Sequence, residues 1–374
     1  MLKAVGIISE YNPFHNGHLY QLRQAKKITN ADLTVVVMSG NWVQRGEPAI
    51  FDKWSRTRMA IKSGVDLVVE LPFQCAVQPA DLFAKYAVNI LGHLKCDYLS
   101  FGCENYHINF KELGNFKIQD SIKNNLKSSM PYASAIREYV FEKTGQSISS
   151  PNDILGMNYS VANKSLEHPM QIFPVKRLGA EHDDLKLNIH KNISSASAIR
   201  SSIFHKKKNF NDYLPSYYND FNFDDFINWD DLFPYLKYRI ITSSLSDLKQ
   251  VYQVNEGLEF KLKKEITSSN TFEEFMSKIK SKRYTYARLR RLCCYILVNY
   301  KDDAIFDYVR ILGFNQTGRT YLKQIKKSVD VPIISRANKK NLNDELKYEY
   351  KAGFMISLIT HENEDLYRFP LIYK

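Results

Sequence analysis

Two histidines near the N-terminus have the spacing and the setting of an anion-binding site. His15 and His18 enclose an Asn-Gly pair, and they stand between an apolar run that ends at Ser9 and an amphipathic run. A helix N-terminus offers unpaired N–H groups and the positive end of a dipole, and Gly17 lets the backbone approach a ligand closely. Imidazoles add donors that can follow charge developing on an α-phosphate. The pattern predicts a phosphate site at a strand-to-helix junction, with a plain helix N-cap and incidental histidines as the alternative.

A second candidate phosphate-binding element is the sequence ISSASAIR at residues 193–200. Three serines precede a helical run, where hydroxyl and N–H groups could grip a phosphate, and Arg200 could hold a second phosphate oxygen. Alone, this element is more typical of an ordinary N-cap, but its pairing with the upstream histidines favours phosphate binding. Asp52, Lys53 and Arg56 are weaker candidates, expected near a triphosphate, with ordinary helix-face charges as an equal alternative.

A strongly basic segment lies in the last third of the chain. Residues 278–291, KIKSKRYTYARLRR, contain seven Lys or Arg and no acid. Taken as a continuous helix, the segment places Tyr284, Arg288 and Arg291 on one face, opposite a buried apolar seam. Together with Arg283, this stripe is predicted to bind RNA, and Lys206 to Lys208 could extend it; a solvated charged face is the alternative.

Composition narrows the class of protein. The 374 residues carry a formal net charge of +12, which suggests a polyanionic partner, and nucleic acid is favoured over membrane. The five cysteines form no CxxC pair, so a reducing cytosol is expected and a disulfide framework is not. No His/Cys/Asp/Glu cluster has zinc-site spacing, no signal peptide is evident, and no apolar run approaches the roughly 20 residues that cross a bilayer. The sequence predicts a soluble cytoplasmic protein without a protein-held metal.

Short apolar runs alternate with amphipathic ones through the first 200 residues. Strands are predicted at 3–8, 33–40, 65–72 and 96–102, and helices at 18–28, 53–64 and 81–94. This alternation indicates an α/β fold with a Rossmann-like parallel sheet, which binds ligands beyond the carboxyl ends of its strands. After His205 the chain becomes polar and tyrosine-rich, and then helical periodicity dominates. A domain of residues 1–205 and a mostly helical, basic domain of residues 206–374 are therefore expected.

Long blocks of the chain resemble one bacterial family of the HxGH nucleotidyltransferase superfamily, the tRNA(Met) cytidine acetate ligases. The resemblance is carried by GIISEYNPFHNGHLYQL, SGNWVQRGEPAIFDKWSRTRMA, VDLVVELPF, SFGCE, SPNDILGMNY, KRLGA and RYTYARLRR. It implies that residues 1–205 bind ATP, accompanied by Mg²⁺, and convert acetate to acetyl-adenylate. It also implies that the acetyl group passes to N4 of the wobble cytidine of elongator tRNA(Met), held by a tRNA-binding domain at 206–374.

The resemblance also implies which residues form the site. His15 and His18 are the expected catalytic pair. Without the family, Gly102 would be a turn glycine, Asn152 a turn or cap residue and Arg177 a surface charge. The expected ATP-binding residues are Ile7, Ile8, Ser9, Glu10, Tyr11, Asn12, Pro13, Phe14, His15, Asn16, Gly17, His18, Leu19, Tyr20, Gly102, Asn152 and Arg177.

Two other functions share parts of this pattern. A small-molecule adenylyltransferase of cofactor synthesis would need the histidines, but it would not need some 170 further residues with a basic segment. A non-catalytic RNA-binding protein on the same scaffold would have no reason to keep both histidines. No nucleophile elbow and no Ser/His/Asp or Cys/His set is evident, which suits adenylation by positioning and charge stabilisation. No protein partner is predicted, and the oligomeric state cannot be derived from these patterns.

Overall fold

The computed structural model describes residues 1–116, 132–148, 150–178, 192–205, 208–220, 226–301, 308–339 and 346–374. Lys206, Lys207 and the side chain of Lys208, the expected extension of the basic segment, lie outside this description. Gly179 and Ala180 of the KRLGA block lie outside it as well.

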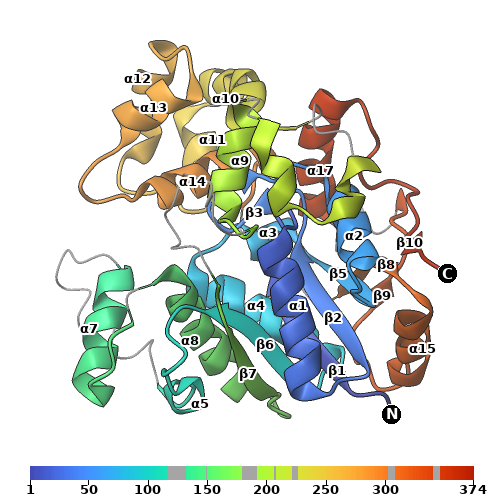
Figure 1. Ribbon diagram of the computed structural model, residues 1–374. Coiled ribbons are helices and arrows are strands. Elements are labelled where there is room, and N and C mark those ends of the chain that lie inside the picture. Colours follow the sequence, from blue (N-terminus) through green and yellow to red (C-terminus); the bar gives the residue numbers. More distant parts are fainter. Residues whose placement is uncertain are drawn as a thin grey trace.

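A mostly parallel sheet forms the centre of the molecule (Figure 1). Its strands are β1 (Ala4–Ser9), β2 (Leu33–Ser39), β5 (Leu67–Leu71), β6 (Tyr98–Cys103), β7 (Gln171–Lys176), β8 (Val309–Phe314), β9 (Ile333–Ile334) and β10 (Leu371–Ile372). The order is β10-β8-β5-β2-β1-β6-β7, and β9 pairs with β8. Only the β5–β8 pair is antiparallel among these strands. The predicted α/β class with a Rossmann-like parallel sheet is confirmed.

Helices cover both faces of the sheet, which explains its nearly continuous apolar strands. Every residue of β2, LTVVVMS, is buried. One face packs against α1 (Asn16–Thr29), α2 (Lys53–Lys62) and α9 (Ala196–Phe204), and the other against α4 (Ala80–His93), α8 (Pro151–Lys164) and α15 (Gln316–Ile325). The remaining elements fill the connections: α3 (Phe73–Ala76), α5 (Phe110–Leu113), α7 (Tyr132–Thr144), the 3₁₀ helices η1 (Lys208–Tyr213) and η2 (Ser216–Asp220), and the hairpin β3 (Trp42–Val43)–β4 (Glu47–Pro48).

A helical part packs at the carboxyl ends of the strands, uppermost in Figure 1. It comprises α10 (Trp229–Thr242), α11 (Leu245–Lys249), α12 (Leu258–Thr267), α13 (Phe272–Ile279), α14 (Tyr286–Val298) and α17 (Lys347–Thr360). Its core is continuous with Trp42 and Phe73, which follow β2 and β5. Among the described residues, no helix is both long and apolar enough to cross a membrane.

The C-terminal half of the chain is mostly helical, as predicted, but it is not a wholly helical unit. Strands β8, β9 and β10 return to the sheet, and α15 packs on its face. The apolar run of β8, VRILGF, supplies a neighbour for β5, which would otherwise be an edge strand of the parallel sheet. The boundary at residues 205–206 stays a prediction, and it does not coincide with an end of the sheet.

Candidate nucleotide-binding site

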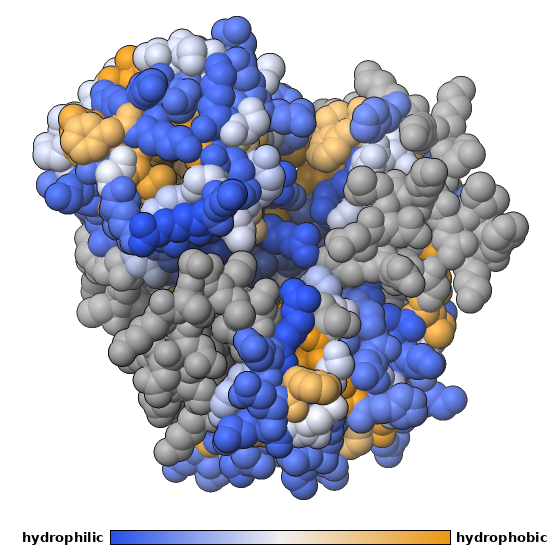
Figure 2. Space-filling model, turned by 90° about the vertical axis from the view of Figure 1, so that its left-hand side faces the viewer, coloured by the Kyte–Doolittle hydropathy of each residue, from blue (hydrophilic) through white to orange (hydrophobic). Residues whose placement is uncertain are grey.

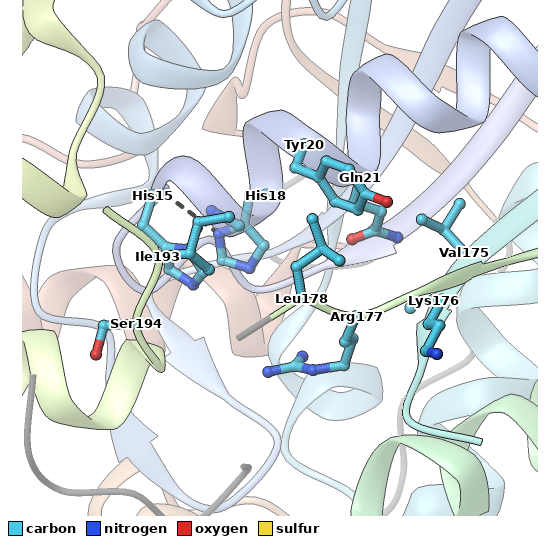
Figure 3. Close-up of a pocket in the computed structure, with 12 residues that line it drawn as sticks. His15, His18, Tyr20, Gln21, Val175, Lys176, Arg177, Leu178, Ile193 and Ser194 are labelled. Carbon is cyan, nitrogen blue, oxygen red and sulfur yellow. Dashed lines mark hydrogen bonds between the residues drawn. The ribbon is translucent and has the colours of Figure 1, made fainter. Parts of the chain in front are cut away.

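The HxGH residues stand at the carboxyl end of β1, where α1 begins, and they line a hollow (Figure 3). Its walls come from the start of α1, the end of β6, the residues that end and follow β7, and the segment before α9. The lining residues are His15, Gly17, His18, Tyr20, Gln21, Gly102, Val175, Lys176, Arg177, Leu178, Ile193 and Ser194. The topology thus brings together residues that are far apart in the sequence: His15 and Ser194 are separated by 179 positions.

The two imidazoles form a reciprocal cap at the start of α1. The N–H of Gly17 donates to His15 Nδ1 at 3.0 Å, and the N–H of His15 donates to His18 Nδ1 at 3.3 Å. The rings stack with their centroids 3.8 Å apart. Because each Nδ1 accepts a hydrogen bond, a neutral ring carries its proton on Nε2. The cap therefore leaves two N–H donors, one on each ring, for a ligand.

Burial and nearby positive charge keep both rings neutral. Desolvation lowers the pKa of His15, and the charges of His18, Arg177 and Arg200 lower it further. Desolvation and then Arg177 lower the pKa of His18 to about 3. Neutral imidazoles at this position act as hydrogen-bond donors, and an approaching phosphate would favour their protonation.

The ISSASAIR element lies beside the histidines, as its chemistry predicted. Ser195 caps α9 by accepting the N–H of Ala198 at 3.1 Å, and Ser194 lines the hollow. A Cβ on Gly17 would lie 2.8 Å from His15 Cε1 and 3.6 Å from Ile193 Cγ2, so the close approach requires glycine there. Arg200 Nη1 donates to the carbonyl of Asn12 at 2.8 Å and ties α9 to the HxGH loop.

Asn152 and Arg177 converge on one carboxylate, that of Glu104, and Gly102 lies beside Arg177. Arg177 Nε lies 3.3 Å from Glu104 Oε1, and Asn152 Nδ2 donates to the same oxygen at 2.5 Å. Glu104 Oε2 accepts the Ser150 hydroxyl at 2.6 Å. A Cβ on Gly102 would lie 3.3 Å from Arg177 Cγ. The signal for Glu104 was present in the sequence, because it directly follows the carboxyl end of β6.

The hollow opens into a larger cavity of about 390 Å³, which is within the usual range for small-molecule sites. The two share His18, Gln21, Gly102 and Arg177. The larger cavity adds residues from the end of β1, the β3–β4 hairpin and the starts of α4 and α8, among them Ile8, Ser9, Glu10, Gln44, Arg45, Phe83, Asn152 and Tyr159. The arrangement can hold an extended, anionic ligand that spans several strand ends.

Part of the expected ATP-binding stretch lies beneath the site. Ile7, Tyr11 and Phe14 are buried in the core on the α1 face of the sheet. The Tyr11 and Phe14 rings contact the His18 ring, with centroids 4.9 and 5.7 Å away. Like these three, Asn12, Pro13, Asn16 and Leu19 are absent from the linings of both parts of the cavity. Direct contact of these residues with a nucleotide stays a prediction, whereas the contacts of Tyr11 and Phe14 with the His18 ring are visible.

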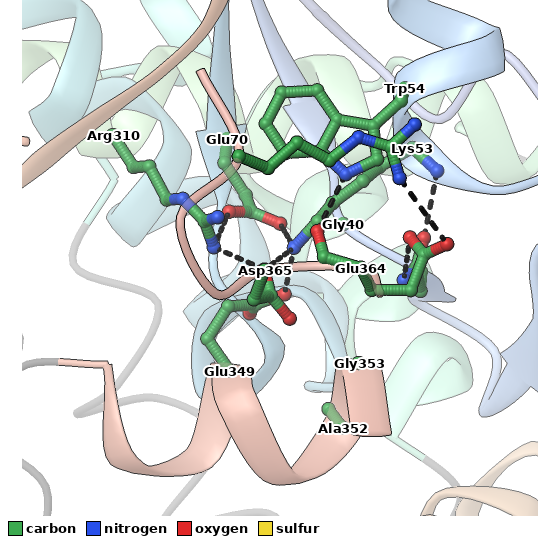
Figure 4. Close-up of polar contacts among 12 residues, drawn as sticks. Gly40, Lys53, Trp54, Glu70, Arg310, Glu349, Ala352, Gly353, Glu364 and Asp365 are labelled. Atoms are coloured by element: carbon green, nitrogen blue, oxygen red, sulfur yellow. Dashed lines mark hydrogen bonds and ion pairs between the residues drawn. The ribbon is translucent and has the colours of Figure 1, made fainter. Parts of the chain in front are cut away.

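The expectation that Lys53 and Arg56 lie against a triphosphate is wrong. Lys53 is fully buried, and its Nζ contacts Glu70 at 2.7 Å, Glu349 at 3.1 Å and Asp365 at 2.6 Å (Figure 4). Arg56 is also fully buried, and it donates to the backbone carbonyls of Phe51, Glu10, Ser39 and Gly40. Asp52 is the N-cap of α2.

The basic segment is not one helix, and Arg291 is not on an exposed stripe. Helix α13 ends at Ile279 and α14 begins at Tyr286, capped by Thr285. Arg291 is 8% exposed, and a Cβ on Gly46 of the β3–β4 hairpin would lie 2.3 Å from its backbone nitrogen. The predicted RNA contact by Arg291 is therefore wrong, because the hairpin covers that side of α14.

Arg283 and Arg288 do reach the surface. Arg283 pairs with Glu256, while the Arg288 guanidinium stacks over the Tyr284 ring with 4.5 Å to its centroid. Tyr284 itself is buried and donates its hydroxyl to Glu256. The basic surface therefore consists of Arg283 and Arg288 and is smaller than the sequence predicted.

Comparisons with known proteins agree with this geometry. A family model described as HIGH Nucleotidyl Transferase matches residues 2–368. The tRNA(Met) cytidine acetate ligase of Ligilactobacillus salivarius is 40% identical over 381 residues, and that of Lactobacillus gasseri is 42% identical over 389 residues, with 100% of each chain covered. Two crystal structures of Thermotoga maritima TmcAL also match, each over 99% of both chains. The apo form has a TM-score of 0.88 at 27% identity, and the form bound with alpha-thio ATP has 0.86 at 26%. The chain belongs to the HIGH nucleotidyl transferase family and, within it, to the tRNA(Met) cytidine acetate ligases.

Proposed function

We propose that this protein is an ATP-dependent ligase that activates acetate and acetylates N4 of the wobble cytidine of elongator tRNA(Met). The observation that carries the proposal is the pair of neutral imidazoles capping α1 at the carboxyl end of the sheet, with Nε2–H groups unused by the cap. Relatives that cover the whole chain and are named for this activity support the same conclusion.

The first step is adenylation of acetate. An acetate oxygen attacks the α-phosphorus of ATP, the bond between that phosphorus and the β-bridging oxygen breaks, and pyrophosphate leaves with the electron pair. His15 and His18 donate hydrogen bonds to the α-phosphate oxygens as negative charge builds there. The second step passes the acetyl group to the cytidine amine and releases AMP.

ATP would lie across the strand ends that the cavity spans. The N–H groups at the start of α1 and the Ser194–Ser195 segment suit the phosphates, while Gly102, Asn152 and Arg177 hold the rest of the nucleotide. Among the described residues, no group of three His, Cys, Asp or Glu side chains gathers as a metal site. Mg²⁺ would therefore enter with the triphosphate, held largely by phosphate oxygens and water.

The tRNA would contact the basic surface next to the cavity. Arg283 and Arg288 lie at the start of the α14 region, whose Arg290 pairs with Glu47 of the β3–β4 hairpin at 2.8 Å. This hairpin lines the cavity through Gln44 and Arg45. RNA held at Arg283 and Arg288 would thus lie beside the hairpin that lines the cavity. From the tRNA substrate we infer an enzyme of the cytoplasm.

One assay tests the function and its two alternatives. The protein is incubated with ATP, Mg²⁺, labelled acetate and bulk tRNA, and the digested RNA is analysed for N4-acetylcytidine. Labelled N4-acetylcytidine that depends on ATP is the expected result. Pyrophosphate release only with a phosphorylated cofactor precursor would instead indicate a small-molecule adenylyltransferase. RNA binding without any ATP turnover would indicate a non-catalytic RNA-binding protein.

A further inference from the structure

The cavity has a second end on the β2 side, which includes Glu10, a residue that the family resemblance groups with the ATP-binding stretch. In the strand order β2-β1-β6-β7, Gly102 and Arg177 lie on the β6–β7 side of β1. Glu10 directly follows β1, and Gln44 and Arg45 connect β3 to β4 after β2. These three residues also line the cavity. A nucleotide held at His18, Gly102 and Arg177 therefore leaves the β2 side for the second reactant.

The Glu10 carboxylate has one oxygen in use and one available. Oε1 accepts the N–H of Gln44 at 2.9 Å, and the described residues provide no hydrogen bond to Oε2. The backbone of Glu10 is held in place by the buried Arg56, whose Nη1 donates to the Glu10 carbonyl at 2.7 Å. Arg45, at the tip of the hairpin, is exposed, and its charge acts on Glu10.

A carboxylate acceptor beside a guanidinium donor matches the edge of cytosine. The exocyclic N4 amine of cytosine donates hydrogen bonds, and ring N3 and O2 accept them; carboxylates are established acceptors for N4. Uracil presents an oxygen where cytosine has N4, and a carboxylate would repel it. We propose that the β2 side of the cavity takes the cytosine base, with Glu10 accepting its N4 amine and Arg45 facing N3 and O2. This inference rests on the proposed function.

The route to this end of the cavity passes the basic surface. Trp229 Nε1 donates to the carbonyl of Gly46 at 2.9 Å, and Arg290 pairs with Glu47, so both hold the tip of the hairpin against the helical part. Figure 2 shows hydrophilic side chains around the hollow where the upper part of the molecule meets the lower. A base flipped out of a tRNA loop can enter between a basic RNA-binding surface and the strand ends.

Glu10 would also take the proton that the transfer step releases. N4 attacks the carbonyl carbon of acetyl-adenylate and a C–N bond forms. The bond between that carbon and the phosphate oxygen breaks, and AMP leaves with the electron pair. One N4 proton passes to Glu10 Oε2, which gives it to solvent after product release. No other reactant is needed for this balance.

The surroundings of Glu10 suit a base. Desolvation raises its pKa, while the Gln44 N–H and the charges of Arg200 and Arg45 lower it. A carboxylate with a raised pKa accepts a proton more readily. The titratable and charged groups that act on it come from several elements: Arg45, Glu47, Arg56, Tyr159 and Arg200.

The test separates the two partial reactions in the full-length chain with the substitution Glu10→Gln. Acetate-dependent exchange of labelled pyrophosphate into ATP reports adenylation. Single-turnover transfer from enzyme-bound acetyl-adenylate to an elongator tRNA(Met) transcript reports the second step. We expect transfer to fall at least about 100-fold and far more than exchange, since one general base is worth about 10²–10⁴ in the step that it serves. The wild-type transfer rate should also fall as pH drops through the pKa of Glu10, and E10Q should lack this dependence.

Controls make each outcome decisive. Glu167→Gln, at a carboxylate that is 90% exposed, is the matched control and should leave both steps unchanged. If E10Q unfolds at the wild-type temperature and yet loses exchange and transfer to the same extent, the inference is overturned, because Glu10 would then serve ATP or its metal. Should E10Q be unstable, Glu10→Asp keeps a carboxylate and should slow transfer more than exchange. Unchanged transfer in either variant also overturns the inference. Failure of the proposed function itself would appear differently, as absent acetate-dependent exchange in the wild type.

Discussion

At the scale of single residues, the site depends on imidazoles whose tautomer is set by the backbone. Each Nδ1 accepts a main-chain N–H, so each Nε2 proton is directed away from the helix end. Since both rings are neutral before the ligand binds, they contribute directed donors rather than a fixed positive charge. In the proposed reaction their hydrogen bonds would strengthen as charge builds on the α-phosphate, which is the differential binding that catalysis requires.

His18→Ala should abolish adenylation and leave the fold intact. The His18 ring is only partly buried, and its loss removes a donor that strengthens in the transition state. We expect acetate-dependent pyrophosphate exchange to fall about 100-fold or more, as for loss of an oxyanion donor. His168→Ala, at an imidazole that is 86% exposed, is the control. Near-normal exchange in H18A with an unchanged unfolding temperature would mean that the ring is only structural.

The sequence predicted that the histidines and Gly17 lie at a strand-to-helix junction, and the structure confirms this place, because such a junction is a local feature. Lys53 was misjudged for a physical reason: two of its partners, Glu349 and Asp365, are about 300 positions away in the sequence. Such contacts leave no local signal. The position of Glu104 after a predicted strand could be read from the sequence. Its contacts with Asn152 and Arg177 could not, because they exist only once β6, β7 and α8 are assembled.

At the scale of elements, the loop after β6 joins three parts of the site. Asp153, in the first turn of α8, accepts the N–H groups of Glu104 and Asn105 at 2.9 and 3.3 Å. Glu104 in turn holds Asn152 of α8 and Arg177 after β7. The β6 end, α8 and the residue after β7 are thus fixed to one another.

Glu104→Ala should weaken ATP binding more than it slows the chemical step. Loss of the carboxylate releases the Asn152 amide and the Arg177 guanidinium, and a hydrogen bond to a charged group is worth about 1.5–3 kcal/mol. We expect the KM for ATP to rise about tenfold or more, with kcat changed less. Glu112→Ala, on the exposed surface of α5, should change neither. An unchanged KM for ATP in E104A would contradict this positioning role.

Two arginines of α14 should behave in opposite ways. Arg288→Glu should reduce tRNA affinity and spare ATP binding, because Arg288 reaches the surface. Arg291→Glu should instead lower thermal stability, because a carboxylate would be buried where burial already lowers the pKa of Arg291. Gel shifts at moderate salt and thermal melts measure the two effects. Unchanged tRNA affinity in R288E would remove Arg288 from the RNA surface.

Strands and helices of the first 200 residues could be predicted because alternation of buried strands and amphipathic helices is a strong signal. The return of β8 to the sheet could not, since a six-residue apolar run within helical sequence is ambiguous. The wrong prediction that Arg291 is exposed also arose because a sequence pattern does not show tertiary contacts. Helical periodicity gave the spacing of 284, 288 and 291, but it could not show that α14 starts at Tyr286 or that the hairpin covers its side.

At the scale of the whole molecule, a buried ionic cluster joins the sheet to the C-terminal segments. Lys53 and Arg310 contact Glu70, Glu349 and Asp365, from α2, β8, β5, α17 and the segment after α17. Three carboxylates face two cations, so one proton is favoured in the cluster. Desolvation and the charge of Glu70 raise the pKa of Glu349 to about 8.

Stability should therefore fall as pH rises from about 6.5 to about 8, because below 6.5 the lowered pKa values of His15 and His18 act in the opposite direction. Over this range the unfolded Glu349, with a pKa near 4.5, has lost a proton that the folded chain still holds. The free energy of unfolding, measured by urea titration, should decrease by up to about 1.4 kcal/mol per pH unit. Glu364, whose pKa burial raises to about 7, acts in the same direction.

Glu349→Gln should flatten this dependence, because the amide carries no proton to lose. Glu112→Gln, at an exposed carboxyl, is the control and should keep the wild-type slope. The lowered pKa of Asp365 acts only near or below its ordinary value of 3.8, outside this range. A slope that is absent in the wild type, or equal in wild type and E349Q, would contradict the assignment.

The sheet contains strands from both the N-terminal and the C-terminal parts of the chain, and this order affects folding during synthesis. A ribosome that has delivered residues up to 205 has produced β1, β2, β5, β6 and β7, but not β8. At that moment β5 lacks its antiparallel neighbour, and Lys53 and Glu70 lack Arg310, Glu349 and Asp365. The ATP site therefore reaches its final support only after the helical part and the last strands have left the ribosome, so a prematurely terminated chain would not release a competent adenylating fragment.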